Sequence, residues 1–597
     1  MKSRVLGAAV TGGLAALALQ VLLVAPCPAG AVGRTAPATL PAAGARGVSA
    51  TLQKLTASDG AAGDGFGSAL AVDGDTAVVG AELANSGHGA AYVYVLENGA
   101  WTQQQKLTVG GLNANAYFGD SVAVSGDTIV VGAGQQAAAG AYSGAVYVFT
   151  RSGTTWSLQQ TLTASDEAAL WHFGDTVALD GDTLVVAHTG APPNARGGAY
   201  VFTRSGGTWY QQAELLPSGA NDYENMGMSL AISGDTVVAG SPGHDVGNAQ
   251  SAGAVYVFTG SGATWSQQAC LTESDPANVD ELGQSVAIHG DTVVSGAIYN
   301  GGHGAAYVFT RTGTTWAQAV KFVGPLTSNN YGHTVAADGP LVVVGSAANS
   351  ADVWTDFSSG WQKTGTVTDP SGSGGGFGES VALSGTTALF GAQGSSGAAG
   401  AAWAGDVGSC LVRVTPSGVP SWWTNQKPVD VTLTAETAAQ GATVSGVEQR
   451  PYEQGAWSPC AGPLTFADEG SVTWQYRATD SAGHTSDPGF FVVAVDTRPP
   501  STKAFASATC KHGKTASLKY QVIDPVPGSE GATVTVKVTK GKKLVKQLRL
   551  GDQPANKKLT AKFTCKLAKG KYTFTVYAKD LAGNVQTKAG HNTLTVT

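Results

Sequence analysis

The sequence predicts an all-β protein, and two patterns carry that prediction. One apolar hairpin, seen at 122–133 as VAVSGDTIVVGA, is written seven times at spacings of 46 to 56 residues. Beyond residue 414 the hairpin stops, and short alternating strands follow with a turn about every 8 to 12 residues. We therefore expect a seven-bladed β-propeller over 51–405, followed by two Ig-like β-sandwich domains over 414–496 and 497–597.

The N-terminus has the composition of a secretory signal. A short basic segment precedes a nearly uncharged run from Val5 to Val24, and the small residues Ala29-Gly30-Ala31 follow it. We expect a signal peptide over 1–31, a linker over 32–50 and a secreted, extracellular protein without a transmembrane anchor. A membrane anchor is the alternative, and glycine and proline residues that interrupt the apolar run argue against it.

Each copy of the repeat predicts four strands, as the second copy illustrates. Ser121–Val124 and Ile129–Val131 flank a Gly-Asp turn suited to a tight hairpin, and Gly144–Phe149 and Trp156–Leu162 form a second hairpin. The first two strands are apolar at nearly every position, which indicates that both faces of the sheet are covered. Neighbouring blades supply such cover, whereas a sandwich, the alternative fold for this region, does not require near-identical repeats.

The seventh copy lacks a fourth strand of the W-x-x-Q-Q-x-L type. A matching strand, Thr51–Thr56, stands instead before the first copy. We predict that this N-terminal strand completes the seventh blade, because pairing it there closes the ring and removes an exposed sheet edge.

These residues carry a family resemblance. The Phe-Gly opening followed by Val-Val-Gly-Ala is similar to the FG-GAP repeat, the blade unit of integrin-α-type seven-bladed propellers. The GAVYVFTRSG segment at 144–153 resembles bacterial exported FG-GAP proteins. The resemblance covers 51–405 and implies the fold, but propellers host many activities, so it does not imply one function.

Calcium loops belong to the resemblance, but this sequence lacks them. In integrin-type repeats a loop rich in Asp and Asn supplies the roughly six to eight oxygen ligands that Ca²⁺ needs. Here the interval has shortened to a turn such as Gly126-Asp127, so we predict no metal site and no cofactor. We interpret the carboxylates between blades as turn and capping groups, with calcium binding as the alternative; they are Asp59, Asp64, Asp166, Asp222, Asp275 and Asp280.

Loop length predicts which face of the propeller binds a ligand. Connections from second to third strand and from blade to blade are long and variable, and both emerge on one face. The candidate ligand-binding residues on this long-loop face are Tyr117, Trp171, His172, Tyr223 and Tyr331. Packing of these side chains between blades is the alternative. No nucleophile, base and acid stand in a familiar arrangement, so we predict no catalytic residues.

One motif occurs twice in the C-terminal third of the chain. YRATDSAGH at 476–484 is echoed by VYAKDLAGN at 576–584, and the region is similar to bacterial Ig-like modules. Two tandem sandwiches are therefore expected, as a stalk or as a tail that associates with the cell wall.

Five cysteines lie beyond the signal segment, without CxxC or metal-ligand spacing. Because export favours disulfides, we predict the pairs Cys510–Cys565 and Cys410–Cys460, which keep each bridge local. The other pairings of these four residues remain open. Cys270 is then expected to be a small buried residue.

Charge is distributed unevenly along the chain. Residues 497–597 contain seventeen Lys and two Arg against four acidic residues, a net charge of +15, whereas the rest of the chain carries −22. This segment lacks nucleic-acid-binding motifs, so an anionic cell-wall polymer is the expected partner. A Lys-rich surface that only confers solubility is the alternative.

The sequence as a whole predicts an exported, non-enzymatic interaction protein. The propeller is expected to recognise an extracellular protein or glycan. The competing class is a secreted carbohydrate-active enzyme with its active site on the long-loop face, and a third is a structural spacer. The enzyme is favoured if Trp171, His172, Tyr223 and Tyr331 converge on the central channel.

Overall fold

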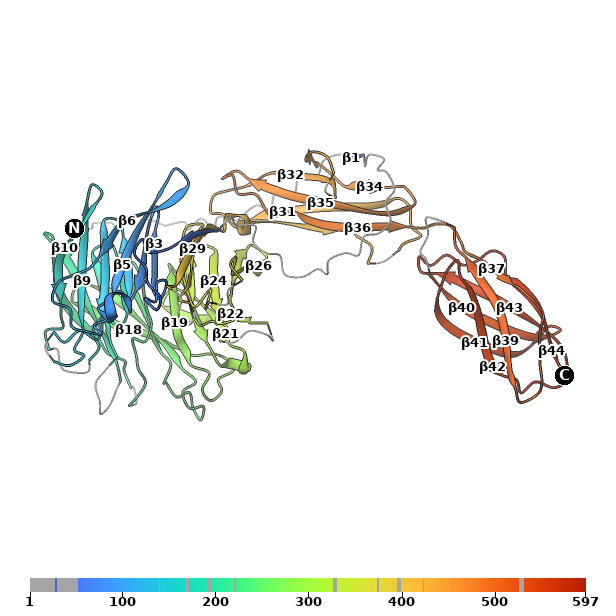
Figure 1. Ribbon diagram of the computed structural model, residues 1–597, viewed down its shortest axis with the longest axis horizontal. Coiled ribbons are helices and arrows are strands. Elements are labelled where there is room, and N and C mark those ends of the chain that lie inside the picture. Colours follow the sequence, from blue (N-terminus) through green and yellow to red (C-terminus); the bar gives the residue numbers. More distant parts are fainter. Residues whose placement is uncertain are drawn as a thin grey trace, which may run out of the picture.

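The computed structural model of the 597-residue chain describes residues 52–597, with short gaps, and the backbone of Cys27–Pro28. The gaps are 139, 167–170, 190–195, 220–221, 326–329, 373–374, 395–398, 422, 453 and 526–530. The predicted signal peptide and linker therefore lie almost entirely outside the described residues. Among those described, helical turns are confined to α1 (Ala84–Gly87), Asn300–Gly302 and Gly408–Leu411. Three β-rich bodies follow one another along the chain (Figure 1).

The first body, here called the propeller body, contains seven four-stranded antiparallel sheets in the described part of the chain. The first sheet consists of β3 (Leu70–Asp73), β4 (Thr76–Ala81), β5 (Ala90–Glu97) and β6 (Ala100–Leu107). The second consists of β7 (Val122–Ser125), β8 (Thr128–Ala133), β9 (Ala145–Ser152) and β10 (Thr155–Leu162). The third consists of β11 (Val177–Asp180), β12 (Thr183–His188), β13 (Gly198–Ser205) and β14 (Thr208–Leu215).

The remaining sheets repeat this order. The fourth consists of β15 (Leu230–Ser233), β16 (Thr236–Ser241), β17 (Ala254–Ser261) and β18 (Thr264–Leu271). The fifth consists of β19 (Leu282–His289), β20 (Thr292–Ala297), β21 (Ala305–Thr312) and β22 (Thr315–Val323). The sixth consists of β23 (Val335–Asp338), β24 (Leu341–Ser346), β25 (Ser350–Phe357) and β26 (Gly360–Thr368). The seventh consists of β27 (Ser380–Ser384), β28 (Thr387–Ala392), β29 (Ala401–Asp406) and β2 (Gln53–Leu55).

The inner strands of these sheets are covered on both faces, as their apolar sequences predict. Every residue of β8 is buried. One apolar cluster joins Val78 and Val93 of the first sheet to Ile129 and Val131 of the second, and similar clusters lie between other neighbouring sheets. The hydrophobic effect therefore holds each sheet against its neighbours.

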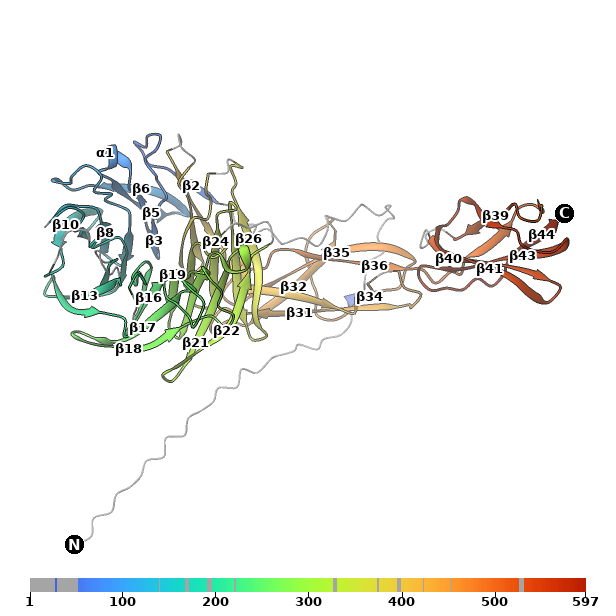
Figure 2. The same ribbon diagram turned by 90° about the horizontal axis from the view of Figure 1, so that it is seen from below.

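The sheets are arranged around a common axis (Figure 2). The first strand of each sheet contacts the first strand of the next, and β27 of the seventh sheet contacts β3 of the first. The strand before the first repeat pairs as predicted, with Lys54 of β2 opposite Trp403 of β29. These repeated sheets and their closed contacts fit a β-propeller.

The second body, the first sandwich, has two sheets. One contains β30 (Val412–Ser417), β31 (Val429–Thr437) and β34 (Leu464–Phe466), with β1 (Cys27–Pro28) paired to β34 in parallel. The other contains β32 (Val444–Pro451), β33 (Ser458–Pro459), β35 (Gly470–Asp480) and β36 (Gly489–Val495). Val431 and Leu464 pack in one cluster with Trp474 and Val493 of the facing sheet.

The third body, the second sandwich, is built in the same way. Its three-stranded sheet contains β37 (Ser501–Ala504), β39 (Thr515–Ile523) and β42 (Lys558–Thr564). Its five-stranded sheet contains β38 (Ala508–Cys510), β44 (Gly590–Val596), β43 (Gly570–Asp580), β40 (Gly531–Lys540) and β41 (Lys543–Pro554). Leu518 and Tyr520 of the first sheet share a core with Val536 and Phe574 of the second.

Candidate functional site

The long-loop face of the propeller body carries a repeated backbone feature. The residue directly before the Phe-Gly position of each repeat has a positive φ, between 53° and 80°. A positive φ is strained for residues other than glycine, which occupies only two of these places. The seven residues are Gly65, Tyr117, His172, Asn225, Glu281, Asn330 and Gly376. The backbone therefore forms one repeated platform on which the side chains differ.

Two further repeated positions lie at the same end of the sheets. One follows the Phe-Gly pair and holds Ser68, Asp120, Asp175, Met228, Gln284, His333 and Glu379. The other follows the second strand and holds Glu82, Gly134, Thr189, Pro242, Ile298, Ala347 and Gln393. Three of the four acidic residues of these sets, Glu82, Asp120 and Asp175, belong to the first three sheets, and Glu379 belongs to the seventh. The fourth and fifth sheets carry no acidic residue at these positions and hold Met228, Pro242 and Ile298 together with Gln284. The end of the axis is therefore chemically asymmetric.

Three carboxyl groups, here called the acidic cluster, lie together at the first three sheets: Glu82, Asp120 and Asp175. Burial, a hydrogen bond with Glu82 and the charges of Glu82 and Asp175 raise the pKa of Asp120 to about 8. Burial raises the pKa of Asp175 to about 6, opposed by His172 and by a hydrogen bond from Thr189. At neutral pH a protonated Asp120 can donate a hydrogen bond while its neighbours accept.

The surroundings of Asp175 explain how this cluster forms. A side chain on Gly134 would place its Cβ 1.7 Å from Asp175 Oδ1, so the glycine leaves room for the carboxylate in the position that it occupies. His172 Nδ1 lies 3.8 Å from Asp175 Oδ2. The Tyr142 ring stacks on the His172 ring with centroids 6.0 Å apart and an interplanar angle of 6°. An aromatic pair therefore borders the acidic cluster.

The five predicted ligand-binding residues are not brought together. His172 borders the acidic cluster, and Tyr223 is 64% exposed. Tyr117 is half-buried on the backbone platform. Trp171 stacks on His188 and Tyr200, with ring centroids 5.1 Å and 6.4 Å away.

The prediction for Tyr331 is wrong. Its side chain is only 2% exposed, because it occupies the buried Phe position of its repeat. Its hydroxyl accepts a hydrogen bond from Trp354 Nε1 at 2.8 Å, and burial raises the pKa of Tyr331 well above its usual value.

The acidic cluster itself was missed in the sequence. Its residues are 38 to 93 positions apart, and nothing local links them. Comparison of equivalent positions across the seven repeats is the signal that could have found it.

Carboxylates between the sheets have structural partners. Tyr92 and Tyr307 donate hydrogen bonds to Asp59 and Asp275 at 2.9 and 2.7 Å. Lys106 and Lys321 hold the second oxygen of the same carboxylates, each at 2.7 Å. Tyr200 donates to Asp166 in the same way. The carboxylates of Asp59, Asp166 and Asp275 therefore link separate segments of the propeller body, in addition to the turn and capping role that we expected of them.

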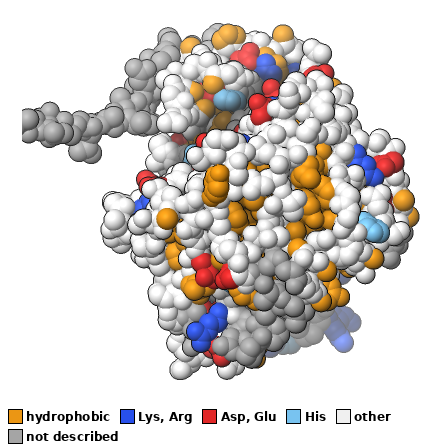
Figure 3. Space-filling model, turned by 90° about the vertical axis from the view of Figure 1, so that its left-hand side faces the viewer, with side chains coloured by type: hydrophobic (Ala, Val, Ile, Leu, Met, Phe, Trp, Pro, Cys, Tyr) orange, Lys and Arg blue, Asp and Glu red, His pale blue; other side chains and the backbone are white. Residues whose placement is uncertain are grey.

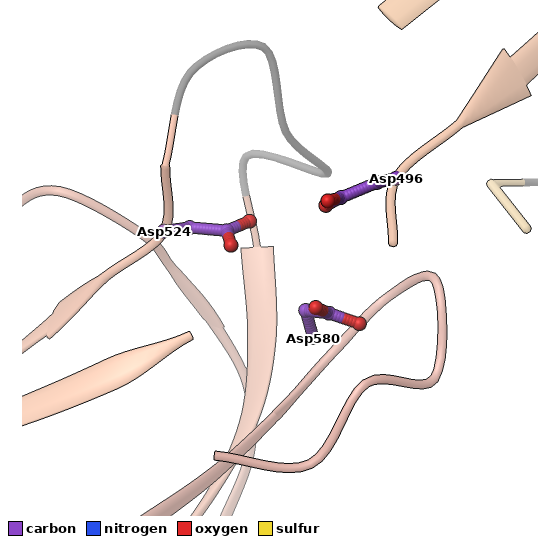
Figure 4. Close-up of side chains that lie close together, drawn as sticks. All are labelled: Asp496, Asp524 and Asp580. Carbon is purple, nitrogen blue, oxygen red and sulfur yellow. The ribbon is translucent and has the colours of Figure 1, made fainter. Parts of the chain in front are cut away.

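One set of carboxylates in the described residues could hold a metal ion, and it lies outside the propeller body. Asp496 follows β36, Asp524 follows β39, and Asp580 ends β43 (Figure 4). One oxygen of each lies within 4.8 Å of the others, and all three residues are buried. Oxygen donors of this kind suit Ca²⁺ or Mg²⁺. The sequence prediction of no metal site overlooked the set because its members are far apart along the chain.

Cysteines in the described residues are all free thiols, so neither predicted disulfide is formed. Cys410 packs in the core of the last propeller sheets, whereas Cys460 packs against the core of the first sandwich. Cys510 and Cys565 share the core of the second sandwich. The prediction that Cys270 is buried is wrong, because it lies on the exposed side of edge strand β18.

One face of the propeller body carries few charged side chains. On the side of the propeller body farthest from the sandwiches, uncharged side chains predominate, and charged ones occur in small groups (Figure 3). No helix in the described part of the chain is long and apolar enough to cross a membrane.

Comparison with known proteins identifies the repeat. The FG-GAP repeat family matches residues 50–94, 101–149, 156–202, 209–258 and 265–309. These five matches fit an FG-GAP propeller together with the four-stranded sheets. No curated protein matches the chain.

Solved structures resemble the chain only weakly. The extracellular domain of BT4673 from B. thetaiotaomicron is 11% identical, covers 89% of this chain and 86% of its own, and has a TM-score of 0.20. The fibronectin(III)-like modules of Clostridium thermocellum CbhA are 16% identical, cover 31% and 94%, and have a TM-score of 0.19. Superpositions at these TM-scores add nothing to the fold described above.

Proposed function

We propose that the chain is an exported, non-enzymatic recognition protein with a seven-bladed FG-GAP propeller as its head and two Ig-like modules behind it. Five matched repeats, seven four-stranded sheets and the closed contacts between first strands support the propeller. The apolar N-terminal segment supports export to the extracellular space. Facing sheets with alternating inward residues support Ig-like modules.

The long-loop face is the proposed binding surface, and its repeated platform is the observation that carries the proposal. A propeller can bind different ligands because the same backbone positions carry different side chains in each repeat. Three exposed tyrosines stand on this face, Tyr142 at 44%, Tyr223 at 64% and Tyr299 at 46% exposure. Together with the acidic cluster they suit a hydroxyl-rich glycan or an extracellular protein.

A binding screen tests this assignment. The full chain is applied to arrays of glycans and extracellular matrix proteins, alongside a Tyr142→Ala/His172→Ala variant. We expect at least one ligand that the variant no longer retains. Tyr210→Ala is the matched control, because Tyr210 is 52% exposed but lies on the outer strand β14, away from the long-loop face. Equal binding by all three proteins would contradict the proposal.

A carbohydrate-active enzyme is the second candidate function, and the acidic cluster favours it. A carboxyl group with a raised pKa beside an ionised one is the arrangement of a general acid and its partner. The test is release of reducing sugar from polysaccharides by the full chain and by Asp120→Asn. If the full chain releases sugar and Asp120→Asn does not, the function of this face is catalysis and not recognition.

The two sandwiches are proposed to form a stalk that associates with an anionic cell-wall polymer through its basic end. The net charge of +15 over residues 497–597 supports this tethering. Attraction between many exposed charges must weaken as salt shortens the screening length, from about 10 Å at 0.1 M to about 3 Å at 1 M. The chain should therefore sediment with wall material at low salt and be released by 1 M salt.

A further inference from the structure

Basic side chains form ion pairs in the propeller body, but the lysines of the second sandwich do not pair with described residues. Seven basic side chains of the propeller body lie within 4 Å of a carboxylate: Lys106, Arg151, Arg196, Arg204, Arg311, Lys321 and Lys363. No lysine of the second sandwich forms an ion pair with a described residue, although the module holds seventeen. Its lysine charge is therefore available to an external anion.

Of the three acidic residues of the second sandwich that lie in the described part of the chain, only Asp552 is exposed. Asp524 and Asp580 are buried at the end that faces the first sandwich. Asp552 accepts a hydrogen bond from Thr533 on the five-stranded sheet. The three-stranded sheet carries no acidic residue on any of its strands.

The outward face of the three-stranded sheet is a regular grid of lysines and small polar residues. Alternation places one set of side chains in the core and the other in solvent. The outward set is Ser501, Lys503, Thr515, Ser517, Lys519, Gln521, Ile523, Lys558, Thr560, Lys562 and Thr564. This set, here called the lysine face, contains four lysines, and its one large apolar side chain, Ile523, is half-buried at the end of β39.

Strand register fixes the spacing of these lysines. Lys519 of β39 lies opposite Thr560 of β42, midway between Lys558 and Lys562. Lys503 of β37 lies opposite Gln521, which is itself opposite Lys558. At about 3.3 Å per residue and about 4.8 Å between strands, the Cα atoms of neighbouring lysines are roughly 8 to 10 Å apart. Hydroxyl and amide groups that can donate hydrogen bonds fill the intervals.

We propose that the lysine face is the docking surface for a linear phosphodiester polymer of the cell envelope. This inference rests on the tethering proposed above and names the surface and the chemistry that perform it. Lysine binds phosphate as a compact charge, and interleaved hydroxyl groups donate to the remaining phosphate oxygens. A flat face suits an extended chain whose charges repeat, because several contacts form at once.

Single-stranded nucleic acid is the less suitable phosphodiester. Proteins that hold it stack its bases on exposed aromatic rings. The outward positions of the three strands carry no aromatic residue. The nearby Phe505 ring is 39% exposed, and Lys558 Nζ lies 5.4 Å from its centroid, so one aromatic ring borders the face and none stands among its lysines.

The experiment compares two sets of charge-neutralising substitutions in the full chain. The test variant is K503Q/K519Q/K558Q/K562Q on the lysine face. The matched control is K543Q/K546Q/K571Q/K579Q, which removes the same charge from exposed positions of the five-stranded sheet. Binding to immobilised poly(glycerol phosphate) is measured from 50 mM to 1 M salt, and thermal melts establish that both variants fold.

We expect the test variant to lose at least about tenfold in affinity at low salt and to show a smaller salt slope. The control should stay within about threefold of the unsubstituted chain. Equal losses in both variants would overturn the lysine face while leaving tethering intact. No binding by the unsubstituted chain would overturn tethering as well. Tighter binding to poly-glutamate or to single-stranded DNA than to poly(glycerol phosphate) would overturn the proposed polymer.

Discussion

Gly74 N donates a hydrogen bond to Ser384 Oγ across 3.1 Å, although the two residues are 310 positions apart. Five further bonds of this kind join the first hairpin turn of one sheet to the next, as from Gly126 N to Asp73. Between the fifth and sixth sheets the link is His289 Nδ1 with Asp338 Oδ1 at 2.9 Å. The contact between Gly74 and Ser384 is thus the one that closes the circle.

Removal of the N-terminal strand should destabilise the seventh sheet and with it the closure of the ring. Deletion of residues 32–57 removes β2, which leaves the edge of β29 with unpaired backbone groups and the core without Leu55, now 2% exposed. We expect aggregated or protease-sensitive protein, measured by gel filtration and limited proteolysis. Deletion of 32–50 alone is the control and should be harmless. A stable monomer after the longer deletion would contradict closure by this strand.

Asp120 should make the propeller body less stable as pH rises. Its folded-state pKa of about 8 lies above the ordinary aspartate value of 3.8, so the folded state holds a proton that the unfolded chain releases. The stability due to that proton is present below pH 3.8 and is lost as pH rises through 8. Asp120→Asn keeps the neutral form at every pH.

The melting temperature of Asp120→Asn, relative to that of the natural chain, should therefore increase from pH 4 to pH 9. Glu97→Gln, on an exposed hairpin, is the control and should give a constant difference. A constant difference for Asp120→Asn as well would mean that the carboxyl group ionises normally.

Chelation should leave the unfolding of the propeller body unchanged. Asp59, Asp166 and Asp275 between its sheets already accept hydrogen bonds from tyrosines, and Asp59 and Asp275 also contact lysines. Such oxygens are not available as a calcium cage. Tryptophan fluorescence during heating, with and without EDTA, measures this transition. A fall of several degrees in EDTA would show that calcium is structural there.

Oxidation should link Cys510 to Cys565 and leave Cys410 and Cys460 as thiols. Cys510 and Cys565 are buried in one core, and burial together with the Cys565 thiol raises the pKa of Cys510 to about 11. A bridge between them would close a long loop and stabilise the module by about 4 kcal/mol. Peptide mapping without reductant should find this pair alone. A linked peptide containing Cys410 and Cys460 would contradict the separation of their cores.

Local sequence patterns were sufficient to predict where the strands lie and in which order they follow one another. Repeated Gly-Asp turns and apolar runs such as Ile129–Val131 specify a hairpin wherever they occur, because turn geometry and side-chain alternation act over a few residues. The missing fourth strand of the seventh repeat even predicted where Thr51–Thr56 would pair, since an open sheet edge must be satisfied.

Side-chain neighbours across sheets were decided by the tertiary structure alone. Tyr331 and Tyr223 looked equivalent as aromatic residues beside a repeat opening, yet one fills the core and the other is exposed. Glu82, Asp120 and Asp175 come together only because three successive sheets bring their ends to one axis. Sequence alone determined the repeated hairpin, the closing strand and the Lys-rich module, because these follow from local pattern and composition. Tertiary structure decided the acidic cluster and the lysine face, because burial and charge proximity depend on residues that meet only after the chain has folded.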